Sequence, residues 1–384
     1  MKTDFEMSKE THYIFKKNFE GQSNFYIENS NMEIQFATFR QQKQNLFITR
    51  MQQALPSPDF CYTSDATMSE NQSFQYPVFR LKDTDKSNKC IILLHGLNER
   101  SWEKYWQWAT YLVQATGKTV ILFPIAFHMN RTPQQWYNPR TILQWLQKRK
   151  HILNNPENLT FANLAMSDRL TMTPLRFYTS GCETAYNIWQ LMDEIDKGEH
   201  PYLKPNTDVD FFAYSIGAYL AQALLMSNPD GYFTNSRLFM FCGGSLFDQM
   251  NGNSKYIMDK QTFDKMLMFY NNDFLALEGD KNNTFDRSFR AMINANIDND
   301  YRTEFFSSAT HRIHGIALTK DIVMPISGIK KALGEKVAEN CIEEMDFPFD
   351  YTHEHPFPQN NQANPELVAQ MFQRVFSTAS NFLA

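Results

Sequence analysis

The sequence predicts an α/β fold built on a mostly parallel sheet with helices on both faces. Short β-branched or aromatic runs alternate along the chain with longer segments of helical period. Several of these runs are continuously apolar, as strands covered on both faces should be. The 384 residues are 42% hydrophobic and only 21% charged, a composition that excludes a disordered chain.

Seven segments have the pattern of strands, and five have that of helices. The strands are expected at residues 74–81, 90–94, 119–124, 209–214, 237–242, 313–318 and 341–347, and the helices at 102–115, 180–197, 215–228, 326–333 and 365–384. For the last helix, Asn364 is expected to be the N-cap and Pro365 the first helical residue. The alternation of strand and helix favours parallel pairing.

Three regions fall outside this alternation. Residues 1–73 are polar and rich in Gln and Asn, with one strand candidate at 32–39, so we predict an N-terminal extension packed on the core. Residues 74–384 form a single domain in this interpretation. Insertions at 128–179 and 245–312 are expected to form a helical cap, or lid, over one edge of the sheet.

Two side-chain groups stand out in the insertions. The first insertion carries five arginines, for which we expect a solvated face rather than a site for a substrate carboxylate: Arg131, Arg140, Arg149, Arg169 and Arg176. The second supplies flexible apolar side chains, which could line a site for an acyl chain or aromatic group or fill the cap's own core. These are Phe247, Met250, Met258, Phe263, Met266, Met268, Phe269 and Phe274.

Charge and composition exclude several classes of protein. A net charge of −5 leaves no surplus of cations for a phosphate backbone, so we expect no nucleic-acid partner. The N-terminus lacks the apolar run of a secretory signal, and the longest apolar runs, 91–94 and 120–126, are far shorter than the roughly 18 residues of a membrane span. We therefore expect a cytoplasmic protein with no membrane span.

Cysteine and histidine spacing gives no sign of a metal site. The five cysteines are odd in number and mostly lie in apolar stretches, which suits buried thiols in a reducing compartment: Cys61, Cys90, Cys182, Cys242 and Cys341. No C-x-x-C or H-E-x-x-H spacing occurs, so we predict no structural zinc. No cofactor is expected either.

The sharpest functional signal is segment 208–225, an apolar strand that runs directly into an amphipathic helix with Ser215 at the junction. A nucleophile at such a turn has a strained backbone and needs small residues two positions to either side, as Ala213 and Gly217 are. The turn would aim the Ile216 N–H at an oxyanion beside the serine hydroxyl. A serine that only caps the helix is the alternative, although a cap does not require small neighbours on both sides.

A second signal is the strand 90–94, which ends in His95-Gly96. Glycine at this position lets the backbone turn, so that the Leu97 N–H would point into the same site as a second oxyanion donor.

Together, these two signals resemble the α/β-hydrolase superfamily, in which a strand ending in His-Gly is followed later by strand, turn, serine and helix. The resemblance covers residues 74–384 in element order, and its motifs are confined to short segments. Ala213 stands where many members have glycine. The 120 residues between His95 and Ser215 exceed what the compact core of the family needs, which the insertion at 128–179 would explain.

The resemblance implies the chain order nucleophile, acid, histidine. After the strand 313–318, Asp321 precedes a hydrophobic pair and a proline, which resembles the acid loop of many members; such a carboxylate accepts the imidazole N–H. An ordinary loop aspartate is the alternative. Asp248, after the strand ending at Cys242, would serve if the acid lay one strand earlier.

The family places its catalytic histidine in the loop between the last strand and the terminal helix, where this chain has His353 and His355. We favour His353, because it lies nearer the carboxyl end of the strand and because Pro356 restricts the backbone of His355. A metal pair formed by the two histidines around Glu354 is the alternative, but no further ligand cluster is visible.

The resemblance thus implies a serine hydrolase that cleaves a small-molecule carboxylic ester through a Ser-His-Asp triad and an acyl-enzyme. It also admits thioester or amide hydrolysis and acyl transfer to an acceptor other than water. A binding protein that keeps the fold and has lost the chemistry is an alternative of another class. The complete ordered set of Ser215, Asp321 and His353 counts against it.

Overall fold

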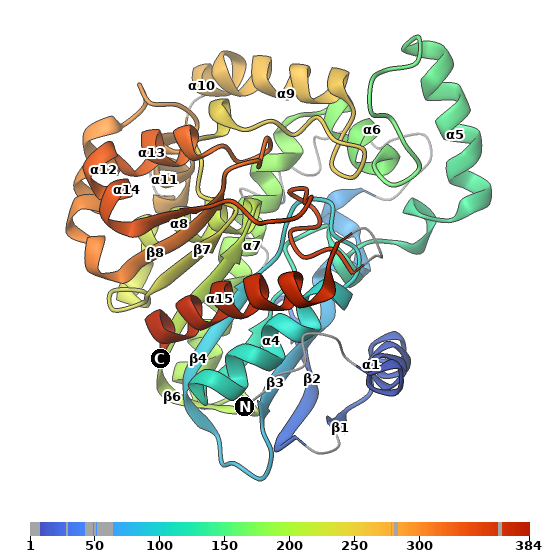
Figure 1. Ribbon diagram of the computed structural model, residues 1–384. Coiled ribbons are helices and arrows are strands. Elements are labelled where there is room, and N and C mark those ends of the chain that lie inside the picture. The colour runs from blue at the N-terminus through green and yellow to red at the C-terminus, as the bar shows by residue number, and fades with distance from the viewer. Residues whose placement is uncertain are drawn as a thin grey trace.

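The computed structural model describes residues 8–27, 30–42, 49, 51, 64–277, 279, 283–359 and 363–384 (Figure 1). Within these residues, nine strands form one sheet in the order β1-β2-β3-β5-β4-β6-β7-β8-β9. The strands are β1 (Phe25–Ile27), β2 (Met32–Arg40), β3 (Ser73–Leu81), β4 (Ser87–Leu94), β5 (Thr119–Leu122), β6 (Leu203–Tyr214), β7 (Leu238–Phe241), β8 (Ile313–Leu318) and β9 (Ile342–Met345). The pairs β1–β2, β2–β3 and β3–β5 are antiparallel, and the other five pairs are parallel.

Helices cover both faces of the sheet (Figure 1). On one face, α1 (Lys9–Gly21), α4 (Glu103–Thr116) and α15 (Pro365–Leu383) contribute to one core with Ile91 and Leu93 of β4. On the other face, α7 (Leu175–Asp196), α8 (Ile216–Ser227) and α11 (Thr284–Ala291) contribute to a second core with Ile92 and Leu94 of the same strand. Alternate side chains of one strand therefore enter two different cores. The predicted fold class, a mostly parallel α/β sheet with helices on both faces, is confirmed.

Eight further helices complete the described chain: α3 (Ser69–Gln72), α5 (Pro139–Ile152), α6 (Leu164–Met172), α9 (Lys260–Asn271), α10 (Asp273–Ala276), α12 (Asn299–Ser308), α13 (Ile326–Leu333) and α14 (Glu335–Cys341). The N-cap predicted for the terminal helix is confirmed, since Asn364 Oδ1 accepts the Glu366 N–H at 2.9 Å and Pro365 follows the cap. The strand predicted at 341–347 is shorter than expected, because α14 continues through Cys341 before β9 begins.

The N-terminal residues extend the sheet. The strand predicted at 32–39 is confirmed as β2, and it pairs with β3 along its whole length, from Met32 opposite Leu81 to Arg40 opposite Ser73. Strand β1 and helix α1 were not predicted. The described part of residues 1–73 thus contributes two strands to the sheet in addition to a packed helix.

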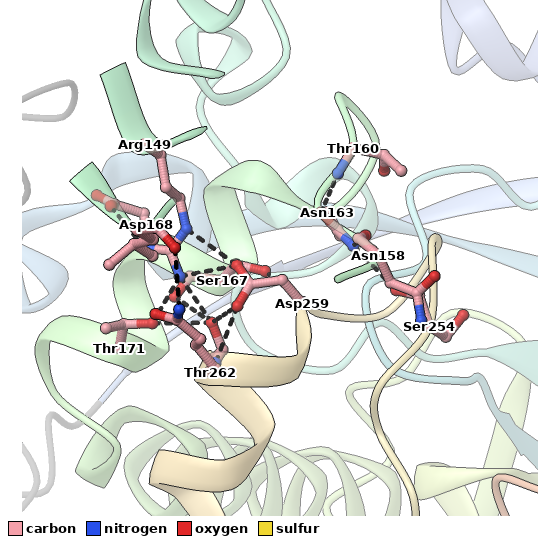
Figure 2. A network of polar contacts seen from close by, with 12 residues as sticks. Arg149, Asn158, Thr160, Asn163, Ser167, Asp168, Thr171, Ser254, Asp259 and Thr262 are labelled. Atoms are coloured by element: carbon pink, nitrogen blue, oxygen red, sulfur yellow. Dashed lines mark hydrogen bonds and ion pairs between the residues drawn. The ribbon is translucent and has the colours of Figure 1, made fainter. Parts of the chain in front are cut away.

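The two insertions are joined by buried polar contacts (Figure 2). Arg149 of α5 donates from Nε and Nη2 to Asp259 Oδ2, at 2.9 and 2.8 Å, and from Nη1 to Asp168 Oδ1 at 3.1 Å. Asp259 also caps α9 by accepting the Thr262 N–H at 2.9 Å. Asp259 is fully buried and Arg149 nearly so. Two ion pairs of one arginine therefore link α5, α6 and the start of α9.

A second set of contacts joins the insertions at the other side of Figure 2. The Asn163 amide donates to the carbonyls of Asn158 and Ser254, at 2.7 and 2.9 Å, and its oxygen accepts the Thr160 N–H at 2.9 Å. In Figure 1, helices α5, α6, α9 and α10 lie together at the top of the molecule. The division into an extension, a core domain and a cap remains a prediction.

The expectation of a solvated face for the arginines is wrong for four of the five, since only Arg140 is exposed. Arg169 donates to both carboxylate oxygens of Asp65 at 3.0 Å, and Arg176 Nε donates to Oδ2 of the same residue at 2.9 Å. Burial alone would raise the pKa of Asp65, but the two guanidinium groups hold that pKa below its ordinary value. Ion pairs with distant segments thus keep these arginines inside.

Three features concern compartment and metals. None of the described helices combines the length and the apolarity that crossing a bilayer requires. In the described ranges, no three His, Cys, Asp or Glu side chains come together as a metal site would need. Cys61 lies outside the described residues, and the other four cysteines are buried thiols.

Candidate active site

The turn between β6 and α8 holds Ser215 in an unusual backbone conformation, with φ 56° and ψ −125°. A non-glycine residue in this region of φ is strained, typically by about 1–3 kcal/mol, and persists only where its surroundings fix it. Here the Ser215 N–H donates to the Phe241 carbonyl at 3.2 Å, and the Ser215 carbonyl accepts the Ala218 N–H at 3.0 Å.

Small residues let other backbone segments approach this turn. A Cβ atom at Gly217 would lie 2.6 Å from the Leu94 carbonyl oxygen, and one at Gly243 would lie 2.5 Å from the Ser215 carbonyl oxygen. Both contacts are with backbone, which cannot move aside as a side chain could. The glycine expected two residues after Ser215 is therefore required by packing, and Gly243, which the sequence analysis missed, is required in the same way.

Three side chains converge at this turn from the ends of three strands. The Ser215 hydroxyl lies 2.7 Å from His353 Nε2, and His353 Nδ1 lies 2.7 Å from Asp321 Oδ2. Since Nδ1 faces a carboxylate, it carries the ring proton, and Nε2 accepts from the hydroxyl. The other carboxylate oxygen, Asp321 Oδ1, accepts the N–H groups of Val323 and Met324, both at 2.9 Å. The three side chains are almost wholly buried.

The loop that carries His353 is held in place by contacts with residues that the sequence analysis did not identify. The Tyr214 hydroxyl donates to the His353 carbonyl, and the two rings stack with centroids 5.5 Å apart. Lys104 of α4 forms an ion pair with Glu99, donates to the Glu354 carbonyl at 3.1 Å, and lies 4.5 Å from the centre of the Tyr214 ring. No local pattern in the sequence links these residues, which come from four separate segments.

His95 and Gly96 shape the loop after β4. His95 Nδ1 donates to the Gly96 carbonyl at 2.8 Å, and Nε2 accepts the Ile125 N–H at 2.9 Å. Burial, assisted by the nearby His128, holds the pKa of His95 well below its ordinary value, so the ring is neutral. Both ring nitrogens are therefore used to hold backbone, and His95 has a structural place in the site.

The two N–H groups expected to face an oxyanion belong to Leu97 and Ile216. In the described part of the chain, neither N–H donates to a hydrogen bond. Both residues line a cavity of about 30 Å³ that also contains Ser215. Beside the serine there are thus two backbone N–H groups that make no hydrogen bond within the described residues.

The two alternative site residues lie elsewhere. The His355 ring packs edge-on against Tyr256 at 5.2 Å, and burial lowers its pKa. Asp248 donates its backbone N–H to Ile293, and its buried Oδ1 has no partner among the described residues. The structure brings neither residue into contact with Ser215 or with His353.

The cavity beside Ser215 is lined largely by side chains of residues 245–312. Five of the eight apolar residues expected for an acyl site border it: Phe247, Met250, Met258, Phe263 and Met266. Of the other three, Met268 is 68% exposed, and Phe269 and Phe274 do not line this cavity. A larger cavity of about 490 Å³ lies on the other side of the loop after β4, and Leu97 borders both.

Comparisons with known proteins give structural likenesses and one family. An esterase from Pseudomonas putida ECU1011 is 9% identical, with 98% of this chain and 91% of that chain covered and a TM-score of 0.44. Carboxyl esterase 2 from Tuber melanosporum is 9% identical (81% and 83% covered, TM-score 0.46), and an esterase from Pyrobaculum calidifontis is 11% identical (98% and 95% covered, TM-score 0.43). No curated protein matches the sequence. Residues 7–384 match the family of unknown function DUF6051, and the chain therefore belongs to that family.

Proposed function

We propose that the protein is a serine hydrolase that cleaves a carboxylic ester of a small molecule through an acyl-enzyme. The observation that carries this proposal is the chain of two short contacts, Ser215 Oγ to His353 Nε2 and His353 Nδ1 to Asp321 Oδ2, both 2.7 Å. In this geometry the imidazole accepts a proton from the hydroxyl while a carboxylate orients the ring and stabilises the imidazolium that forms.

The first half of the reaction forms the acyl-enzyme. Ser215 Oγ attacks the ester carbonyl carbon as its proton passes to His353 Nε2, and the carbonyl oxygen becomes an oxyanion. The free N–H groups of Leu97 and Ile216 donate to that oxyanion. When the tetrahedral intermediate collapses, the carbon–oxygen bond to the alcohol breaks, and the proton on Nε2 goes to the departing alkoxide.

The second half releases the acid. Water takes the place of the alcohol, gives a proton to His353 Nε2 and attacks the acyl carbon. Collapse of this second intermediate returns the proton to Ser215 Oγ and frees the carboxylic acid. Asp321 holds the imidazole in place throughout, since one of its oxygens accepts the imidazole N–H and the other accepts two backbone N–H groups.

The side chains of the proposed cap favour a substrate with an apolar acyl group. Met250, Met258 and Met266 border the cavity with Ser215, and methionine side chains change shape at little cost. Because the cavity of about 30 Å³ holds only about two water-sized groups, an acyl chain fits only after these side chains move.

A fluorophosphonate probe followed by peptide mass spectrometry tests the proposal. We expect the label on Ser215 and on no other serine. Ser215→Ala should lose the label and about 10⁴-fold or more of kcat for p-nitrophenyl butyrate. Ser227→Ala, at the other end of the same helix, is the matched control and should keep both. A fully active Ser215→Ala variant would exclude this mechanism.

A further inference from the structure

Another cavity is bordered by residues of the loop that follows β4. It has a volume of about 40 Å³ and a mostly apolar lining, and Arg100, His128 and Tyr137 are among the residues with polar groups that border it. Since one water needs about 10–15 Å³ of such volume, the cavity has room for about three water-sized positions.

The Arg100 guanidinium group is the first unusual feature of this cavity. Among the described residues it has no hydrogen bond and no ion pair, and it lies over the Tyr137 ring, 5.6 Å from the ring centre. Burial lowers its pKa. Arg100 is half-buried, and a guanidinium carries five N–H donors and no acceptor, so it offers donors to an anion in this cavity.

The other charged residues that border this cavity have partners. Arg169 and Arg176 both bind Asp65. The Glu99 carboxylate is paired with Lys104. Arg100 has no counter-ion among the described residues, so its charge favours a negatively charged ligand.

His128 is the second unusual feature. Its Nδ1 lies 2.9 Å from the Ala126 carbonyl, which can only accept, so Nδ1 carries the proton. Nε2 is then an acceptor, and it is buried with no partner within the described residues. The ring is 96% buried, and burial with the charges of Arg131 and Arg100 lowers its pKa to about 4, so it is neutral at pH 7. An unmet buried acceptor typically costs about 1–3 kcal/mol, which a ligand donor would recover.

From these two features we infer that Arg100 and His128 form a substrate-binding subsite for a carboxylate that has a hydroxyl or N–H on the adjacent atom. Arg100 supplies donors and a positive charge, and His128 Nε2 supplies an acceptor. A ligand that satisfies both must combine an anionic acceptor with a nearby donor, and the small cavity requires the two to be adjacent.

The subsite lies next to the proposed reaction centre. Leu97 and Phe177 border both this cavity and the one that contains Ser215, and Leu97 carries one of the unused N–H groups. The two cavities are thus adjacent. This inference rests on the proposed function, because it assigns the subsite to the substrate of that reaction.

Three small probe molecules distinguish the contribution of Arg100 from that of His128. Lactate has both the carboxylate and the hydroxyl, propionate lacks the hydroxyl, and lactamide lacks the charge. We expect lactate to bind about tenfold more tightly than either of the other two, as one lost hydrogen bond to a charged or buried group predicts. Binding is measured by ligand-observed NMR on the full chain carrying Ser215→Ala, so the readout does not depend on turnover.

Variants then assign each preference to a side chain. Arg100→Met should abolish the preference for lactate over lactamide, and His128→Phe should abolish that for lactate over propionate. The Ser180 hydroxyl still donates to the Ala126 carbonyl when the imidazole is gone, which favours folding of the second variant. Arg140→Met, an exposed arginine of the same insertion, is the control and should keep both preferences.

The outcomes are distinguishable from failure of the proposed function. Equal binding of the three probes, or an Arg100→Met variant that keeps its preference for lactate over lactamide, would overturn the subsite. If Arg100→Met does not fold, Arg100→Lys, which keeps the charge but loses the planar fork, replaces it and should lower lactate affinity about tenfold. Absence of serine labelling and of ester hydrolysis in the wild type, together with the expected probe preferences, would refute the hydrolase and leave the subsite standing.

Discussion

Replacement of Asp321 by asparagine tests the proposed mechanism most directly, because it removes one charge and almost no volume. Asp321 Oδ1 accepts two backbone N–H groups, from Val323 and Met324, and Oδ2 accepts the ring N–H of His353. An amide can keep the two backbone contacts only if its oxygen takes the place of Oδ1. Its NH₂ group then faces His353 Nδ1, which must become an acceptor, and the ring proton moves to Nε2.

The magnitude follows from these contacts. If the amide were rotated so that its oxygen faced His353, two backbone hydrogen bonds of about 1 kcal/mol each would be lost, and the NH₂ group would face the backbone N–H groups. About 2–3 kcal/mol therefore favours the tautomer with the ring proton on Nε2, which cannot accept the serine proton. Loss of the charge-assisted bond to the imidazolium adds about 1.5–3 kcal/mol. The sum of about 4–6 kcal/mol corresponds to a loss of about 10³–10⁴ in kcat. Binding of the ester, and hence KM, should change little.

Hydrolysis of p-nitrophenyl butyrate, followed at 405 nm with kcat and KM determined separately, gives the answer. Asp248→Asn is the matched control, since that carboxylate does not contact His353, and it should stay within about threefold of the wild type. Thermal unfolding checks that both variants fold. A loss of less than tenfold for Asp321→Asn, or a larger loss for Asp248→Asn, would refute the assignment of the acid.

Three further predictions concern packing. Gly217→Ala should lower the free energy of unfolding by about 1–3 kcal/mol in chemical denaturation, since its Cβ would overlap backbone; an unchanged midpoint would contradict the close approach. Met266→Ala should shift the ratio of kcat/KM for octanoate over butyrate esters about tenfold upward, and an unshifted ratio would remove Met266 from the acyl site. Arg149→Met should lose about 3–5 kcal/mol of unfolding free energy, because Asp259 stays buried without its partner. The exposed Arg140→Met should lose less than about 0.5 kcal/mol, and equal losses for the two would show that the Arg149 ion pair contributes nothing.

The sequence predicted those parts of the fold and the site that depend on local pattern. The strand–turn–helix at Ser215 and the loops after β8 and β9 each follow a strand, and the carboxyl ends of parallel strands meet at one edge of the sheet. That rule predicts that the three loops lie near one another, and the resemblance to the α/β-hydrolase superfamily then implied Asp321 and His353 within them. Their catalytic roles remain predictions.

The parts that were missed depend on contacts between distant segments. Arg169 and Arg176 are inside because Asp65 pairs with both, and nothing within ten residues of either arginine reveals this partner. Helix α1 was missed because its few apolar residues lie in a polar stretch, although Phe15 is fully buried against the sheet. The role of Tyr214 was missed for the same reason, since its hydroxyl donates to the carbonyl of a residue 139 positions later in the sequence.

The position of Leu97 limits how members of this family could change their substrate. Among the described residues, Leu97 borders four cavities, and its N–H is one of the two that make no hydrogen bond beside Ser215. Lengthening or shortening the loop 97–101 would displace that N–H, so rate and selectivity would fall together. Exchange of side chains on a fixed backbone, at Arg100 or among the methionines of the cap, leaves the donor in place. Divergence of substrate range within the family should therefore appear as substitutions around a loop of constant length.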